Sequence, residues 1–127
     1  MKTLLYTLCD GAFNYGGRIT VVGTYDQILM TEIPGVAKAN FALRFLASRE
    51  ELGQTANLRV EFRDANDNPV SESMSRSVPI PETGSNSIHL ALAGSAQLNV
   101  AEAGMHKMVC YINDIEVENL DFAIIVQ

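Results

Sequence analysis

The stretch from residue 104 to residue 126 constrains the fold most strongly, because its pattern is that of two β-strands joined by a tight turn. Apolar and polar residues alternate on both sides of Asn113-Asp114. Both turn residues tolerate the positive φ angles that a two-residue hairpin loop requires, so Ile112 is expected to pair with Ile115. The inward-facing sets of the second strand are out of phase by one residue, which predicts a bulge or a switch between sheets near Asn119.

Short alternating segments recur along the rest of the chain, separated by residues that favour turns. Strands are expected at residues 3–9, 18–25, 28–33, 40–47, 57–63, 88–92 and 98–100, with a loop at 10–17 and an edge strand or loop at 70–78. Ser48 and Glu51 have the spacing of a helix cap, but the segment is too short for more than one turn. The pattern predicts an all-β fold of one domain, residues 1–127: a two-sheet antiparallel β-sandwich, immunoglobulin-like, with at most one short helical turn.

Local features are predicted at one glycine and at one segment rich in Asp and Asn. Gly23 interrupts an alternating strand, which indicates a bulge or a close crossing of two chain segments. The segment that starts at Asp64 is rich in Asp and Asn before Pro69, and such residues hydrogen-bond to their own backbone in reversals. The same oxygen-rich segment could resemble a calcium loop, but it lacks the glycine and the twelfth-position glutamate that such a loop uses.

Composition excludes several classes of partner. The 127 residues include 47% hydrophobic and 19% charged residues, with a net charge of −6. Nucleic-acid binding depends on Lys and Arg at phosphates, so no nucleic-acid partner is expected. No apolar run approaches the roughly 20 residues of a membrane-spanning helix, and no membrane partner is expected. The spacing of Leu4, Tyr6 and Leu8 fits one face of a strand better than it fits a secretory signal. The protein is expected to be soluble and cytoplasmic.

Cys9 and Cys110 are the only cysteines, and each lies in an apolar strand. In a reducing compartment they are expected to be small core residues. A disulfide between the first strand and the last hairpin is the alternative that the sequence leaves open.

The chain resembles a group of small uncharacterised bacterial proteins with an immunoglobulin-like sandwich. The resemblance is carried by Leu8-Cys9-Asp10 with Gly16 to Asp26, and by the Gly104 strand, the Asn113-Asp114 turn and the strand from Leu120 to Val126. It implies one continuous fold and carries no activity. This chain differs in having His106 where similar proteins usually have an aromatic residue, and Asp114 where they usually have Gly.

The outward face of the last hairpin is a candidate interface. Alternation places an apolar set there that is interrupted by few charges: Met105, Lys107, Val109, Tyr111 and Ile125. An exposed apolar patch of this kind is typical of a surface that binds a protein. The alternative is that the segment from Val70 to Gly84 folds over the face.

The expected loop at residues 10–17 is a second candidate site. Phe13 and Tyr15 could bind a small molecule or a glycan, and Asp10 and Asp26 bracket the first hairpin as a possible carboxylate pair. The simpler role for both aspartates is to accept hydrogen bonds from turn backbone N–H groups.

Metal and nucleophile patterns are weak. Four side chains are of the types that bind zinc: Cys9, Cys110, His89 and His106. No two of them form a close pair in the sequence. His106 is expected to be a core histidine with a backbone partner. Ser85, Ser87 and His89 lie near one another without the turn that a nucleophilic serine needs. No catalytic residue, metal or cofactor is therefore expected.

The sequence thus predicts a non-catalytic binding or assembly module. It would act through self-association or a protein partner at the C-terminal sheet. Small-molecule or glycan binding at the segment from Asp10 to Gly17, or a metal-dependent enzyme, are the alternative classes.

Overall fold

The computed structural model describes residues 1–15, 18–82, 84 and 87–127, with Tyr15 and Ser87 described by their backbone. The described residues form nine strands and one 3₁₀ turn. In chain order these are β1 (Lys2–Tyr15), β2 (Arg18–Tyr25), β3 (Gln27–Met30), β4 (Gly35–Ser48), η1 (Arg49–Glu51), β5 (Thr55–Arg63), β6 (Met74–Pro79), β7 (Ser87–Val100), β8 (Gly104–Ile112) and β9 (Ile115–Val126).

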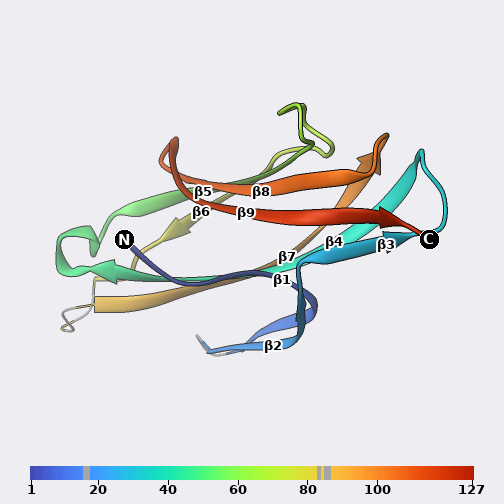
Figure 1. Cartoon of the computed structure of the whole chain (residues 1–127). Coiled ribbons are helices and arrows are strands. Elements are labelled where there is room, and N and C mark those ends of the chain that lie inside the picture. The colour runs from blue at the N-terminus through green and yellow to red at the C-terminus, as the bar shows by residue number, and fades with distance from the viewer. Residues whose placement is uncertain (16–17, 83, 85–86) are drawn as a thin grey trace.

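The strands form two sheets that pack face to face, which confirms the predicted all-β sandwich. The four-stranded sheet has the order β2-β1-β4-β7, and the five-stranded sheet has the order β3-β9-β8-β5-β6. Figure 1 shows them as two layers, with the two ends of the chain at opposite ends of the molecule.

One strand pair departs from the predicted antiparallel arrangement, because β3 pairs with β9 in parallel. Only Asp26 separates β2 from β3, so the chain enters the five-stranded sheet immediately after leaving the four-stranded one. The carbonyl of Asp26 accepts a hydrogen bond of 2.9 Å from the Ala123 N–H, which ties this crossing to β9.

The core lies between the two sheets and follows the predicted alternation. Phe41, Leu43 and Phe45 on β4 are each at most 1% exposed. The Phe62 ring of β5 lies 6.0 Å from the Phe41 ring and 6.1 Å from the Phe122 ring of β9, measured between centroids. The tilted Phe41–Phe62 pair joins the two sheets, and the edge-on Phe62–Phe122 pair extends this cluster within the five-stranded sheet.

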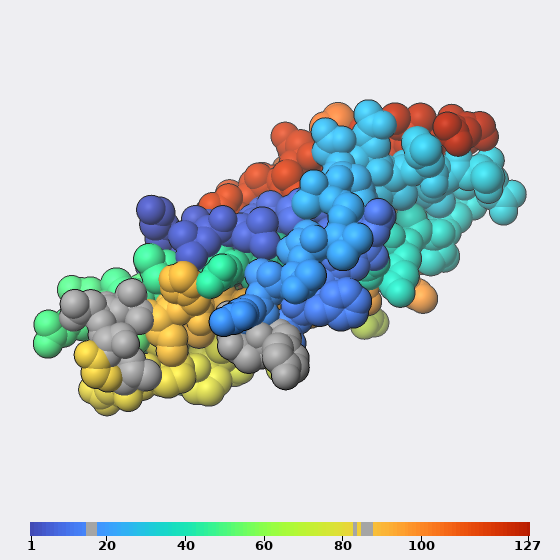
Figure 2. Space-filling view, turned by 90° about the horizontal axis from the view of Figure 1, so that it is seen from below, coloured from blue at the N-terminus to red at the C-terminus, as the bar shows by residue number. Residues whose placement is uncertain are grey.

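The first hairpin folds across the outer face of the four-stranded sheet, where a loop at residues 10–17 was expected. β1 continues to Tyr15 and pairs there with β2. The Asn14 side chain reaches β7, where its Nδ2 donates to the carbonyl of Ala91 at 2.9 Å. Figure 2 shows the hairpin in blue lying over this sheet. Ala42 beneath it is fully buried, although alternation places it on the outer face.

Gly23 marks the place where the hairpin bends away. Its φ is +63°, and its missing side chain leaves room for the Asp10 carboxylate of the paired strand. The β1–β2 ladder has no register shift at Gly23, so the bulge predicted as one possibility is absent there, and the close contact is with a side chain of the paired strand. The adjacent tip of the hairpin, Gly16-Gly17, lies outside the described residues.

β7 is one strand of 14 residues rather than the two short strands expected at 88–92 and 98–100. Gly94, which lies between the two expected strands, is paired with Phe41 in the ladder. A Cβ atom at Gly94 would come within 2.5 Å of the Phe41 ring. The glycine therefore serves packing and does not end the strand.

The last hairpin has the predicted turn and pairing. Asn113 and Asp114 both have positive φ angles, of 50° and 66°, and Ile112 pairs with Ile115. The bulge lies two residues before the expected position, because Cys110 pairs with Glu118 whereas Tyr111 pairs with Glu116.

The two predicted local reversals are also present. Glu51 accepts hydrogen bonds from the backbone N–H and the hydroxyl of Ser48, both at 3.0 Å, and the turn between them is a single one. The Asp64 carboxylate accepts hydrogen bonds of 2.9 Å from the N–H groups of Asn66 and Asn68. Asp64 thus organises a reversal through its own backbone, as expected for an Asx-type turn.

Candidate functional site

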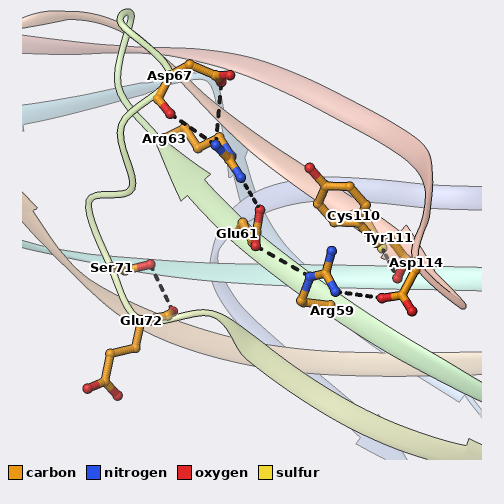
Figure 3. Close-up of polar contacts among 9 residues, drawn as sticks. All are labelled: Arg59, Glu61, Arg63, Asp67, Ser71, Glu72, Cys110, Tyr111 and Asp114. Carbon is orange, nitrogen blue, oxygen red and sulfur yellow. Dashed lines mark hydrogen bonds and ion pairs between the residues drawn. The ribbon is translucent and has the colours of Figure 1, made fainter.

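The outer face of the five-stranded sheet carries a network of ion pairs over β5 and β8 (Figure 3). Glu61 lies between two arginines, with N–O distances of 3.4 Å to Arg59 and 2.6 Å to Arg63. Arg59 also contacts Asp114 at 2.8 Å, and Lys107 contacts Asp67 at 3.1 Å. The network therefore links two strands to the turn at each of their ends.

The network also covers apolar surface. The Arg59 guanidinium lies 4.3 Å from the centroid of the Tyr111 ring, within the range of a cation–π contact. The hydrogen bond that Arg63 donates to the Glu61 carboxylate, opposed by partial desolvation, raises the pKa of Arg63. Long charged side chains cover apolar neighbours with their methylene stems while their charged ends stay in water.

This arrangement corrects the candidate interface at its centre. Val109 faces outward but is only 2% exposed, and Lys107 and Tyr111 beside it are half-buried. The cross-strand neighbour of Val109 is Glu61, which lies at the centre of the ion-pair network. In its described part, the segment between Val70 and Gly84 supplies β6, which extends the sheet at its edge beside β5.

An apolar patch remains exposed at the other end of the same face. Met105 is 52% exposed and Ile125 is 37% exposed. Ile125 pairs with Leu29 of β3, which is 56% exposed, and Met105 pairs with Ala123. We call Leu29, Met105, Ala123 and Ile125 the outer apolar patch.

Sequence reasoning missed Leu29. Its segment was expected to be a strand, but no local signal shows that this strand joins the C-terminal sheet in parallel. Leu29 also borders an open cleft of about 440 Å³ between β3 and β4, whose lining includes the exposed Val36.

The second candidate site is dispersed by the structure. Asp10 lines a shallow cleft of about 340 Å³ together with Tyr25, Lys38 and Asn40. Phe13 instead is 65% exposed and lines a different cleft, beside Gly94 and Ser95 of β7. Asp26 lies at the crossing between the sheets, and the Tyr15 side chain is outside the described part of the structure. Among the side chains that the structure describes, Asp10, Phe13 and Asp26 do not form one site.

The metal-ligand types also lie apart. Cys9 is paired with Asn40, on the outer face of its sheet, whereas Cys110 faces the core from the other sheet. Both are free, buried thiols. Burial and the Asp10 charge raise the pKa of Cys9, and burial with Glu118 raises the pKa of Cys110 to about 11. Among residues 1–15, 18–82, 84 and 87–127, no three metal-ligand side chains come together.

The two histidines have separate surroundings. His106 is 3% exposed, and its Nδ1 lies 3.0 Å from the carbonyl of Gly104, as expected for a core histidine with a backbone partner. Its Nε2 is buried without a partner in the described structure. His89 is exposed and contacts Arg44. Ser85 and the Ser87 side chain, its candidate partners, lie outside the described residues.

Comparisons with known proteins concern the family and the fold. A family model described as a family of unknown function, DUF6941, matches residues 4–125. No curated protein matches the chain. One similar solved structure is a glycosyl hydrolase family 2 member from Bacteroides cellulosilyticus, with 13% sequence identity and a TM-score of 0.47. The match covers 74% of this chain and 14% of that protein, so this chain spans a small part of it. Within the described residues, no helix has the length and hydropathy needed to cross a membrane.

Proposed function

Since the chain belongs to DUF6941, a family of unknown function, we propose a function from its own surface: a non-catalytic assembly module that self-associates through the outer apolar patch of its C-terminal sheet. The observation that carries this proposal is the exposure of Leu29, Met105 and Ile125 on three adjacent strands. Large apolar side chains that are contiguous and exposed favour association with another protein surface.

A second copy is the partner that the charge of the molecule favours at this patch. The chain has a net charge of −6, so two copies repel each other over most of their surface. The patch carries no charged residue, and the nearest cross-strand pair, Lys107 with Asp121, combines both signs. Contact at the patch therefore brings the copies together where like charges are absent.

The cytoplasm of a bacterium is the location that we propose with this function. The support is chemical: both cysteines are free thiols, and free thiols persist in a reducing compartment. A non-catalytic role is supported by the scattered positions of the described carboxylates, histidines and thiols.

The test is the mass in solution of wild type and of a Met105→Glu, Ile125→Glu variant, measured by light scattering over a range of concentrations. We expect the wild-type mass to exceed 13.9 kDa and to rise with concentration, and we expect the mass of the variant to stay below that of wild type at each concentration. Glutamate at two patch positions adds buried like charges to any patch-to-patch contact.

Val22→Glu is the matched control, because Val22 is 54% exposed on the first hairpin, away from the patch. The control should associate like wild type. Equal masses for wild type and the patch variant at every concentration would overturn the proposal.

A further inference from the structure

β7 is an edge strand with an unusually long free side. It pairs with β4 over 14 consecutive residue pairs, and no strand of the described residues lies on its other side. The ladder shows no register shift from Ser87 to Val100. A long, regular edge presents unpaired backbone groups that can pair with another strand.

Two contacts show which backbone groups point to the free side. The carbonyl of Ala91 accepts from the Asn14 side chain, and the N–H of Asn99 donates to the carbonyl of Val70 at 2.7 Å. Neither partner belongs to β4. Because backbone groups in an antiparallel strand alternate between its two sides, Ala93, Ser95 and Gln97 also direct their N–H and C=O groups away from β4. Within the described part of the chain, these groups have no backbone partner.

The two edge strands of the five-stranded sheet carry features that oppose strand addition, and β7 does not. β6 contains Arg76 and ends at Pro79, and β3 is only four residues long. Charges, prolines and short length are the usual protection of sheet edges. The segment from Ser87 to Val100 has no Asp, Glu, Lys, Arg or Pro.

Apolar surface is accessible on both sides of this edge near Gly94. A cavity of about 150 Å³ between the sheets is lined by Phe41, Leu58 and Met74 as well as by Gly94. A second cleft, of about 300 Å³, lies between the first hairpin and the outer side of β7, with Phe13 in its lining. A strand added along β7 would cover both openings.

We propose that β7 pairs antiparallel with β7 of a second copy about a two-fold axis at Ser95, which joins the four-stranded sheets of two molecules into one eight-stranded sheet. The backbone groups of β7 without a backbone partner lie between the contacts at Ala91 and Asn99, a stretch that we call the free window. Ser95 is its central residue. A two-fold interface is self-complementary, so a window bounded at both ends is used most fully when the axis passes through its centre.

The side chains in this register are compatible with the pairing. Ser95 faces Ser95 of the second copy, and Ala93 faces Gln97 of the second copy, so no charges are opposed along the contact. Serine pairs across strands add a hydrogen bond, and small residues allow close approach. Adjacent strands in a sheet are rotated relative to each other by about 20–25°. Beyond the window, this rotation turns the β7 strand of each copy away from the segment that ends the window of the other copy.

This interface lies on a different sheet from the outer apolar patch, and the experiment keeps the two proposals separate. All proteins carry Met105→Glu and Ile125→Glu, which remove association through the patch. Ser95→Lys and Ser95→Glu are then made singly, and their masses are measured alone and as an equimolar mixture by sedimentation equilibrium.

We expect the parent to approach twice 13.9 kDa, each single variant to remain at 13.9 kDa, and the mixture to approach the doubled mass again. Like charges face each other at the axis in each single variant, whereas opposite charges face each other in the mixture. The exposed position of Ser95 keeps the fold intact, which far-UV circular dichroism checks. Thr20→Lys and Thr20→Glu, at an exposed hairpin position, are the matched controls and should behave like the parent.

A monomeric parent would overturn the β7 pairing without bearing on the patch. Single variants with the mass of the parent would also overturn it. A mixture that stays monomeric while both single variants dissociate would reject the two-fold axis at Ser95.

Discussion

His106 is the residue whose surroundings conflict most clearly with its chemistry. It is 3% exposed, its Nδ1 uses the Gly104 carbonyl, and its Nε2 has no partner in the described structure. The ring lies 5.8 Å from the Phe122 ring, so its surroundings are otherwise aromatic. A buried polar atom without a partner costs free energy that an apolar ring of similar shape does not.

We therefore predict that His106→Phe stabilises the protein by about 1 kcal/mol, the net effect of removing an unpaired buried polar group. The lost hydrogen bond to Gly104 matters less, because Gly104 is exposed and water can replace the donor. Urea unfolding followed by circular dichroism measures the change, with His89→Phe at an exposed position as the control. A lower unfolding midpoint for His106→Phe would show that Nε2 has a partner in solution.

At the scale of elements, the first hairpin depends on Gly23. The φ of +63° is costly for residues with a Cβ, by roughly 1–2 kcal/mol, and a Cβ would also collide with the Asp10 carboxylate. We predict that Gly23→Ala lowers the free energy of unfolding by at least about 1 kcal/mol.

The two causes can be separated with Asp10→Ala. In that background the collision with the carboxylate is relieved, so Gly23→Ala should cost less than in wild type, while the backbone strain remains. Thermal unfolding of the four proteins in this double-mutant cycle gives the coupling directly. Equal costs in both backgrounds would mean that Asp10 does not lie over Gly23.

The elements that the sequence predicts correctly are those set by neighbouring residues. Alternation predicted which side chains of β4 face the core, and the tolerance of Asn113 and Asp114 for positive φ predicted the last turn. Features set by distant residues were not predictable: the parallel pairing that brings Leu29 beside Ile125, and the burial of Val109 beneath side chains of another strand. Alternation identifies the outward face correctly, but only the pairing of β5 with β8 shows what covers it.

At the scale of the whole molecule, the buried acids of the core determine how stability responds to alkaline pH. Burial, with smaller contributions from Cys110, Glu118 and Glu116, raises the pKa of Tyr6, whose hydroxyl donates to the Met108 carbonyl at 2.7 Å. Burial and Glu118 raise the pKa of Cys110 from 9.0 to about 11. The folded protein therefore holds these protons at pH values at which the unfolded chain releases them.

The direction follows from proton linkage. A raised pKa in the folded state contributes stability below the unfolded pKa and loses it as pH rises toward the folded pKa. For Cys110 the window runs from pH 9.0 to about 11, and the loss by pH 11 is about 2 kcal/mol. Urea unfolding at half-unit steps from pH 7 to pH 11 measures the slope, and Cys110→Ala should show a shallower fall because it lacks this proton. Because Cys110 also contributes to the raised pKa of Tyr6, the difference between the two slopes reports the thiol together with its coupling to Tyr6. Identical slopes would show that the Cys110 thiol ionises as readily in the fold as in the unfolded chain.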